Sequence, residues 1–263
     1  MASLKLAWAA REHAAAHVLV DGMLSESLQI GGDDAHHLAR VRRLRAGERV
    51  TVSDGSGRWR PYRIVAVTRS DLTLEGDGSM RMEPGLLPRL HVAFALTKGQ
   101  KPETVVARLT ELGVDEITPL LGGRSVVQWD TARIATAADR FGRVAREAAL
   151  QSRRTRLPRI GDPMPLEHLR GVAGVVLAHP DGGPAEDLPE PGDKGWTLVV
   201  GPEGGLADEE LEAMEDAPRL ALGPHVLRAE TAAVAGAAVL TAGRRPSHAV
   251  PKAGVPPAGG HGG

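Results

Sequence analysis

The stretch TLVVGPEGG, residues 197–205, has the pattern of a strand that ends in a glycine-rich loop, and a helical pattern follows it directly. The run 197–200 is short, apolar and partly β-branched, which is typical of a strand buried on both faces of a parallel sheet. Gly201, Gly204 and Gly205 allow the backbone to approach a ligand at the carboxyl end of the strand, where open α/β sheets bind their ligands. The stretch therefore predicts an α/β fold with a ligand site at this loop; a plain tight turn is the alternative.

The charges around this loop indicate what the ligand carries. Glu203 lies in the loop, and the next helix is expected to open with Asp208, Glu209 and Glu210. These carboxylates would repel a phosphate that the amides at the helix start could otherwise bind. The loop also fits neither GxGxxG nor GxxxxGK[ST]. A ligand with an adenosine and a positive charge but no phosphate fits better, and S-adenosylmethionine is one such ligand.

Composition bounds the class of protein. The 263 residues suffice for two modest domains, and the formal net charge of -1 argues against a generally polyanion-binding protein. The chain has no cysteine, which excludes disulfides and thiolate metal sites and is compatible with a reducing cytoplasm. No apolar run approaches the roughly 20 residues that a membrane span needs. We expect a soluble cytoplasmic protein without a membrane segment.

The pattern of elements changes along the chain. Residues 1–75 contain mainly short strand patterns and form a small β-rich domain, followed by a Gly- and Pro-rich linker at 76–88. Strand and helix patterns alternate over 89–243, which predicts a parallel sheet with helices on both faces. The last helix, from Ala229 to about Thr241, is apolar on every side and is expected to be buried, with a subunit interface as one way of burying it. The Pro-, Gly- and Ala-rich residues 244–263 are expected to be a disordered tail.

Arginines form two clusters. The first lies in the small domain: Arg40, Arg42, Arg43, Arg45, Arg49, Arg58, Arg60 and Arg63. The second lies at the end of a long helix expected over 131–150: Arg140, Arg143, Arg146, Arg153, Arg154, Arg156 and Arg159. Together they predict a cleft for a polyanion, and Trp59 and Tyr62 are candidates for stacking on a base. The alternatives are a solvated basic face and, for the second cluster, stabilisation of the helix end.

A second loop resembles the first. Residues 220–231, LALGPHVLRAET, again lead from a strand through a Gly-Pro turn into a helix, so two such loops can line one pocket. Other chemistry is poorly supported. His36 and His37 are neighbours that do not face each other on a helix, so we expect no metal site, and no Gly-x-Ser-x-Gly nucleophile elbow is present.

Several motifs resemble those of one known family. GPEGG at 201–205, LGP at 222–224 and LRAETA at 227–232 resemble signatures of the 16S ribosomal RNA uridine N3-methyltransferases of the SPOUT superfamily. Further motifs match in the same order: HHL at 36–38, DGSG at 54–57, ELGV at 111–114, Ile117, Pro119 and Arg124-Ser125. The chain departs from the family pattern at Arg108, where a lysine is usual, at Ala16-His17, where an aromatic pair is usual, and at 150–154, LQSRR, where EQSGR is common.

The resemblance implies a PUA-like RNA-binding barrel followed by a SPOUT domain, a parallel-sheet domain whose chain end forms a trefoil knot. It also implies a homodimer, S-adenosylmethionine held in the knot loops, and methylation of N3 of a uridine. The partner would be 16S ribosomal RNA or the assembled small ribosomal subunit. A SPOUT ribose 2′-O-methyltransferase and a non-catalytic RNA-binding ribosome-assembly factor are the alternatives.

Roles can be assigned to single residues on this basis. We expect Arg228 to stabilise the uracil anion and Glu203 or Glu230 to accept the N3 proton, although Glu230 has the alternative role of orienting the helix start. The cofactor pocket is expected to use Leu177, His179, Gly201, Gly204, Gly205, Leu222, Gly223 and Leu227. The expected RNA-binding residues are Arg40, Arg42, Arg43, Arg45, Arg58, Arg60, Arg153, Arg154 and Arg156.

Overall fold

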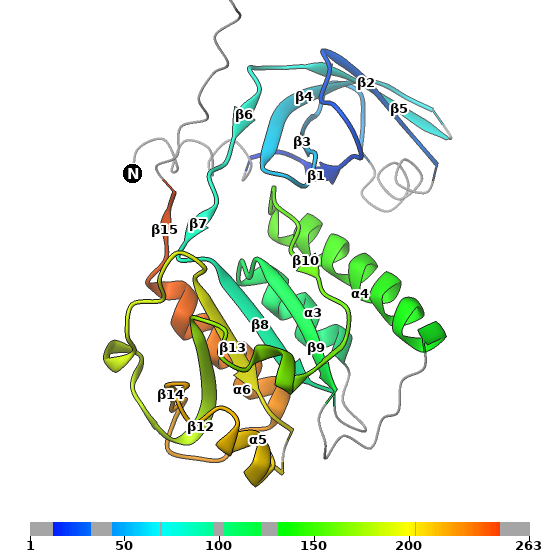
Figure 1. Cartoon of the computed structure of the whole chain (residues 1–263). Helices are drawn as coiled ribbons and strands as arrows, with labels where there is room; N and C mark the ends of the chain where they lie inside the picture. Colours follow the sequence, from blue (N-terminus) through cyan, green and yellow to red (C-terminus); the bar gives the residue numbers. More distant parts are fainter. Residues whose placement is uncertain are drawn as a thin grey trace, which may run out of the picture.

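The computed structural model contains two domains, each built on its own sheet (Figure 1). It describes residues 13–32, 44–68, 70–96, 102–121, 131–202 and 204–247. The helix expected from Asp33 to Leu44 lies outside these segments except for its last residue, as do His36, His37 and Arg124-Ser125.

The N-terminal domain is a six-stranded, mainly antiparallel sheet, as the short strand patterns predict. Its strands are β1 (Ala16–Leu19), β2 (Ser27–Gly31), β3 (Arg49–Ser53), β4 (Arg58–Val67), β5 (Asp71–Gly76) and β6 (Arg81–Met82), in the order β1-β3-β4-β5-β2 with β6 on β4. Only β1 and β3 pair in parallel among these strands. Alternate residues such as Leu72 and Leu74 face a core that also holds Val52 and Ile64, and this alternation is the reason the segments form half-buried strands.

The C-terminal domain is a seven-stranded sheet in which every recorded pair is parallel. Its order is β10-β9-β8-β13-β12-β14, with β11 on β9. The strands are β8 (Leu90–Ala95), β9 (Glu116–Leu121), β10 (Arg159–Ile160), β11 (Met164–Pro165), β12 (Val175–Gly183), β13 (Trp196–Val200) and β14 (Arg219–Leu220). The run 197–200 therefore lies in β13, which is buried along its length near the middle of the sheet, and the parallel-sheet prediction is confirmed.

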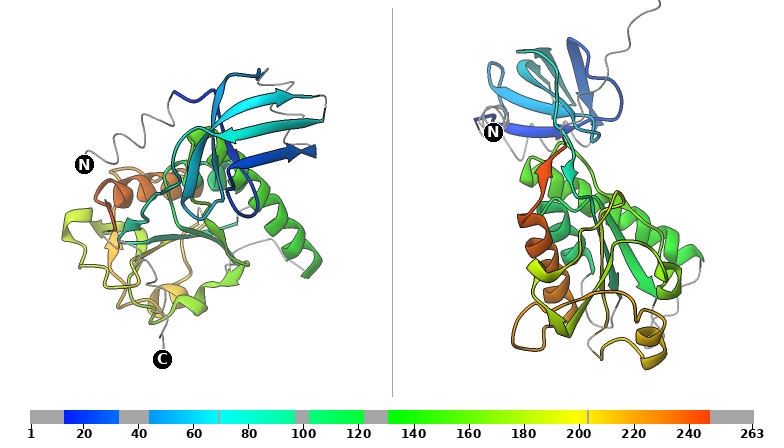
Figure 2. Two further views of the ribbon diagram at one scale, coloured as in Figure 1. Left: turned by 90° about the horizontal axis from the view of Figure 1, so that it is seen from above. Right: turned by 60° about the vertical axis from the view of Figure 1, so that its left-hand side comes forward.

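Helices cover the two faces unequally (Figures 1 and 2). The long helices α3 (Pro102–Glu111), α4 (Thr131–Ser152) and α6 (Ala229–Ala242) contribute to one core with Val92 and Leu198. The other core contains residues of the 3-10 helix Leu166–Leu169 and Met214, just after the short helix α5 (Asp208–Glu212). The apolar character of α6 follows from this packing, because its buried side lies against β8, β13 and α3. None of the helices in the described segments is long and apolar enough to cross a membrane.

The predicted linker carries short strands, and residues 244–247, the start of the expected disordered tail, are ordered. β6 and β7 (Leu86–Leu87) lie within the linker predicted at 76–88, and β7 pairs with β15 (Arg245–Pro246), which the sequence analysis placed in a disordered tail. Arg244 explains the difference, because its buried guanidinium donates to the carbonyls of Pro88 (2.7 Å) and Gly113 (2.8 Å) and pairs with Asp115. Residues 248–263 lie outside the described segments. The trefoil knot stays an expectation from the family resemblance.

Candidate functional site

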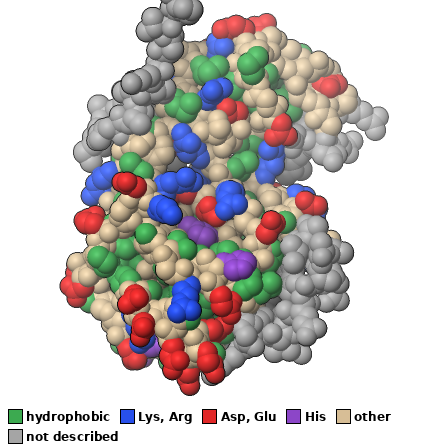
Figure 3. Space-filling model, viewed as in Figure 1, with side chains coloured by type: hydrophobic (Ala, Val, Ile, Leu, Met, Phe, Trp, Pro, Cys, Tyr) green, Lys and Arg blue, Asp and Glu red, His purple; other side chains and the backbone are tan. Residues whose placement is uncertain are grey.

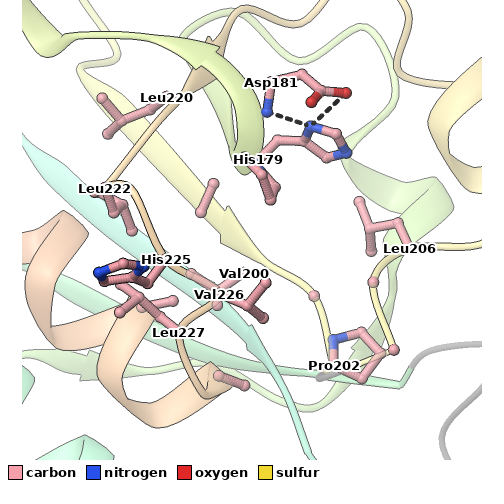
Figure 4. A pocket seen from close by; sticks show the side chains of 18 residues that line it. His179, Asp181, Val200, Pro202, Leu206, Leu220, Leu222, His225, Val226 and Leu227 are labelled. Atoms are coloured by element: carbon pink, nitrogen blue, oxygen red, sulfur yellow. Dashed lines mark hydrogen bonds and ion pairs between the residues drawn. The ribbon is translucent and has the colours of Figure 1, made fainter.

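A hollow of about 340 Å³ opens at the carboxyl ends of β12, β13 and β14 (Figure 4). Two loops contribute to its lining: Gly201, Pro202 and residues 204–206 after β13, and members of 222–227 between β14 and α6. Three neighbouring parallel strands end at one edge of the sheet, so the loops that follow them meet there. This is the arrangement that the two Gly-Pro loops predict.

The first loop turns sharply away from β13. Gly205 donates its N–H to the carbonyl of Pro202 (2.9 Å) and has φ +74°, a conformation that favours glycine. The N–H of Ala207 then donates to the carboxylate of Glu210 (2.7 Å), which fixes the start of α5. A Cβ on Gly201 would lie 3.0 Å from the Leu206 side chain, so glycine lets Leu206 lie against the loop.

The third wall comes from an irregularity in β12. The register of β12 against β14 shifts between Ala178 and Gly183, so the residues between them leave the ladder and His179 and Asp181 line the hollow. The N–H of Asp181 donates to His179 Nδ1 (3.2 Å), and this bond orients the imidazole ring (Figure 4). Asp181 is a lining residue that the sequence analysis missed, although the turn-forming run PDGG at 180–183 marks the end of a regular strand.

The second loop forms the remaining wall and leads into α6. Gly223 has φ +151°, and Leu222 and Leu227 present apolar side chains to the hollow. Val226 is also a lining residue, although its side chain is 84% exposed. α6 lies close to β13, because a Cβ on Gly236 would lie 2.6 Å from the Leu198 side chain and 3.5 Å from that of Leu222.

The structure brings most of the predicted cofactor residues to this hollow. Seven of them line it: His179, Gly201, Gly204, Gly205, Leu222, Gly223 and Leu227. Leu177 does not, because it is fully buried in β12 and packs in the core with Val199. Sequence reasoning also missed further lining residues: Ala178, Pro180, Val200, Pro202, Leu206, Leu220, His225, Val226, Ala229 and Ala232. Most are ordinary apolar residues, for which composition and spacing give no signal.

The lining suits an adenosine without a phosphate. Its walls are mainly Leu, Val, Ala, Pro and Gly, and none of the described lining side chains is a lysine or an arginine. Polar side chains in the lining are those of His179, Asp181 and His225. A phosphate would find no lysine or arginine in this described lining, whereas an adenine ring and a sulfonium would meet apolar surface and a carboxylate. The residues present therefore fit S-adenosylmethionine.

Two of the predicted catalytic residues, Arg228 and Glu230, lie beside the hollow rather than in its lining. Arg228 is the exposed N-cap residue of α6, between the lining residues Leu227 and Ala229. Glu230 lies in the first turn of α6, and its Oε2 is buried without a hydrogen-bond partner in the described part of the chain. Glu203 falls outside the described segments. The described residues contain no group of three or more His, Asp or Glu side chains placed to hold a metal ion.

The arginines of the N-terminal domain differ in their surroundings. Arg45 and Arg58 are exposed, whereas Arg40, Arg42 and Arg43 fall outside the described segments. Arg60 donates to the carbonyl of Gly78 (2.7 Å) and to the carboxylate of Glu26 (2.7 Å), and its side chain is only 11% exposed. Arg60 is therefore held by internal partners. Among the described RNA-binding candidates of this domain, Arg45 and Arg58 are exposed and could contact a ligand.

Most arginines of the second cluster also have internal partners: Arg140, Arg146 and Arg159 pair with carboxylates, and Arg154 and Arg156 bond to main-chain carbonyls. Desolvation of the half-buried Arg154 lowers the pKa of its guanidinium to about 10, and it donates to the carbonyls of Thr110 (2.8 Å) and Val114 (2.6 Å), in and just after the last turn of α3. Arg156 donates through Nε and Nη2 to the carbonyl of Glu83 (3.1 and 2.8 Å). Arg153 has φ +55°, the left-handed conformation that ends α4. Lys and Arg side chains nevertheless gather where the domains meet, and acidic ones gather at the far end of the C-terminal domain (Figure 3).

The expectation that Trp59 and Tyr62 stack on a base is wrong. Both side chains are fully buried, and the Tyr62 hydroxyl donates to the carbonyl of Ser25 (2.7 Å). Arg81 lies over the Trp59 ring, 5.1 Å from its centroid. The two residues are three positions apart in β4 and therefore lie on opposite faces of the sheet, where Tyr62 packs in the core with Val50 and Ile64 and Trp59 is buried on the other face.

Comparisons with known proteins agree with this architecture. A model of the RNA methyltransferase domain matches residues 85–241, and one of the RNA methyltransferase PUA domain matches residues 30–75. The fold and the site thus define an RNA methyltransferase with a PUA domain. A Mycobacterium bovis relative named ribosomal RNA small subunit methyltransferase E is 35% identical over 222 residues, 78% of this chain and 82% of the relative. A Bacillus subtilis relative of the same name is 28% identical, over 78% of this chain and 86% of its own length. This chain belongs to the ribosomal RNA small subunit methyltransferase E family.

Solved structures show the same fold. A Legionella pneumophila protein described as a methyltransferase in complex with S-adenosylmethionine has a TM-score of 0.75 and 28% identity, and the match covers 86% of this chain and 96% of that one. A Neisseria gonorrhoeae ribosomal RNA small subunit methyltransferase E also has a TM-score of 0.75, at 22% identity over 87% of this chain and 98% of its own. At 22% identity, the similarity to the Neisseria protein shows a common fold and nothing further.

Proposed function

We propose that this protein transfers a methyl group from S-adenosylmethionine to N3 of a uridine in the 16S ribosomal RNA of the small ribosomal subunit. The observation that carries the proposal is the hollow between the two Gly-Pro loops, whose described lining has mainly apolar walls and no lysine or arginine. The family's ribosomal RNA methyltransferases and the S-adenosylmethionine complex of the Legionella protein support the same cofactor and class of substrate.

The hollow would hold the cofactor mainly by shape. S-adenosylmethionine, when bound, supplies an electrophilic methyl carbon on a sulfonium. Leu222 and Leu227 would pack on the adenosine, and the backbone of the two glycine loops would approach it closely. Asp181 offers a carboxylate on the opposite wall. These contacts exclude water and leave the remaining opening for the base.

Charged residues of the chain would promote loss of the N3 proton of the uracil. N3 of uracil is a weak acid, and its lone pair becomes available only as the proton leaves. Arg228, exposed beside the lining residues Leu227 and Ala229, would stabilise the developing negative charge. Glu230 or Glu203 would take the proton. The buried, unpartnered oxygen of Glu230 supports a role for it, although orienting the start of α6 remains its alternative role.

The arginines would bind the RNA backbone. Arg45 and Arg58 are exposed, and we propose that they contact phosphates together with Arg40, Arg42 and Arg43. The target base must then leave its stack to reach the hollow. We expect the enzyme to act in the cytoplasm, on 16S ribosomal RNA or on the assembled small subunit. We also propose a homodimer, and Val239 of α6, 43% exposed, is a candidate residue for its interface.

Nucleoside analysis tests this function directly. Small subunits from a strain lacking the modification would be incubated with the protein and S-adenosylmethionine that carries a deuterated methyl group, and the digested RNA would be examined by mass spectrometry. We expect deuterated 3-methyluridine. A labelled 2′-O-methyl nucleoside would favour the ribose methyltransferase. RNA binding without any labelled nucleoside would favour the non-catalytic assembly factor.

A further inference from the structure

A turn of the N-terminal domain is bonded directly into the C-terminal domain. The β3–β4 turn, residues 54–57, lies antiparallel to the loop that follows α4, with Ser56 opposite Arg156. Gly57 donates its N–H to the carbonyl of Thr155 (3.0 Å), and Leu157 donates to the carbonyl of Gly55 (2.8 Å). In Figure 1 this loop rises from the C-terminal domain, between α4 and β10, towards the N-terminal sheet. The two domains are therefore joined by backbone hydrogen bonds as well as by the linker.

The linker takes part in the same junction through Glu83. Its N–H donates to the carbonyl of Gly57 (2.8 Å), and its carboxylate accepts from the Thr155 hydroxyl (2.5 Å). Its carbonyl accepts from Nε and Nη2 of Arg156 (3.1 and 2.8 Å). Turn, linker and loop thus hold one another by both main-chain and side-chain bonds.

The turn is itself preformed. The Asp54 carboxylate accepts from the N–H groups of Ser56 (2.8 Å) and Arg58 (3.2 Å). Gly57 has φ +105°, and a Cβ there would lie 2.6 Å from the guanidinium carbon of Arg156. Glycine at this position therefore serves both the backbone conformation and the close approach of the two domains.

The loop is anchored at its other side to the domain that carries the hollow. Arg154 is half-buried and donates to the carbonyls of Thr110 and Val114, in and just after the last turn of α3. α3 packs on the parallel sheet through Val105, Val106 and Leu109. A continuous set of bonded and packed elements therefore runs from the turn to the sheet whose edge forms the hollow.

We propose that the 54–57 turn is a positioning element that holds the N-terminal domain in one orientation relative to the hollow, and that Arg156 is a positioning residue of this junction rather than an RNA contact. Domains joined only by a linker are expected to move relative to each other. Here the junction opposes that motion, so RNA bound by the N-terminal domain is presented at a fixed distance from the hollow. The catalytic part of this inference rests on the proposed function.

Paired glycine variants test the proposal. Gly57→Ala introduces strain and a clash at the junction, whereas Gly47→Ala introduces similar strain at φ +92°, in the same domain, where a Cβ has no neighbour within 4 Å. Arg156→Met removes the bonds to Glu83 and keeps a long side chain. The chain has no cysteine, so Ser70→Cys and Lys194→Cys, at exposed positions of the two domains, allow spin labels to report the interdomain distance.

We expect a narrow distribution of the distance between the two labels in the double-cysteine protein (the parent) and in its Gly47→Ala variant. The distribution should be broad when Gly57→Ala or Arg156→Met is added. Methylation should show a kcat about 10- to 100-fold lower for the two junction variants, because small misplacements are costly, with unchanged affinity for S-adenosylmethionine. Equally narrow distributions, or a broad distribution with unchanged kcat, would overturn the proposal. If Gly57→Ala does not fold, Arg156→Met carries the comparison. If the parent methylates no RNA, the proposed function fails, and the distances alone decide whether the junction is rigid.

Discussion

Gly236→Ala is expected to weaken both the fold and the cofactor hollow, although alanine is the better helix former. Gly236 lies within α6, and a Cβ there would lie 2.6 Å from Leu198 Cδ2 and 3.5 Å from Leu222 Cδ1. Leu198 is fully buried in β13, so the helix must move instead. Helix propensity favours alanine by about 1 kcal/mol, and overpacking costs about 1–3 kcal/mol. We therefore expect a net loss of about 0–2 kcal/mol in the free energy of unfolding.

The matched control is Gly142→Ala in α4. Gly142 is exposed, and a Cβ there has no neighbour within 4 Å, so this variant should gain up to about 1 kcal/mol. Urea denaturation measures both stabilities, and their difference isolates the steric cost. Because Leu222 and Ala232 line the hollow, calorimetry should show about tenfold weaker S-adenosylmethionine binding, equivalent to about 1.4 kcal/mol, for Gly236→Ala alone. Equal stabilisation of both variants with unchanged affinity would refute this reasoning.

Three further predictions concern single side chains. Arg153→Gly should raise stability by about 0.5–1 kcal/mol in urea denaturation, because φ +55° strains a non-glycine residue. The control Arg143→Gly, at an exposed helical position, should instead cost about 1 kcal/mol. A similar loss of stability at both positions would contradict the argument. Burial lowers the pKa of His91, so the unfolded chain binds a proton at this residue more readily and stability should fall as the pH drops below about 6.5. In a series of thermal unfolding measurements at different pH, His91→Asn should reduce the loss of stability below this pH. An unchanged loss would exclude His91 as its cause. Arg228→Ala should lower methylation of ribosomal RNA about 10²- to 10³-fold and leave calorimetric cofactor binding intact; unchanged methylation would remove Arg228 from the mechanism.

The site could be predicted from the sequence because its signals are local. A short apolar run followed by Gly-Pro marks both the end of a buried strand and the start of a loop, and parallel strands bring two such loops to one edge of the sheet. The excursion of His179 and Asp181 from β12 was less visible, because it depends on the register against β14.

The roles of the arginines were harder to predict, because they depend on tertiary contacts. Sequence shows a cluster of cations but not which of them find carbonyls inside the fold, as Arg154, Arg156 and Arg244 do. Trp59 shows the same limit, because an aromatic residue among arginines has the same pattern whether the strand turns it inward or outward. The ordered chain end at 244–247 depends on the partners of Arg244 and not on its own composition.

Calorimetric titration with S-adenosylmethionine and, in parallel, with ATP tests the central claim most directly, because the two ligands share an adenosine and differ in the phosphates. The lack of a lysine or arginine in the described lining predicts saturable one-site binding of S-adenosylmethionine and no measurable binding of ATP. Binding of ATP at least as tight as that of S-adenosylmethionine, or no binding of S-adenosylmethionine, would contradict it.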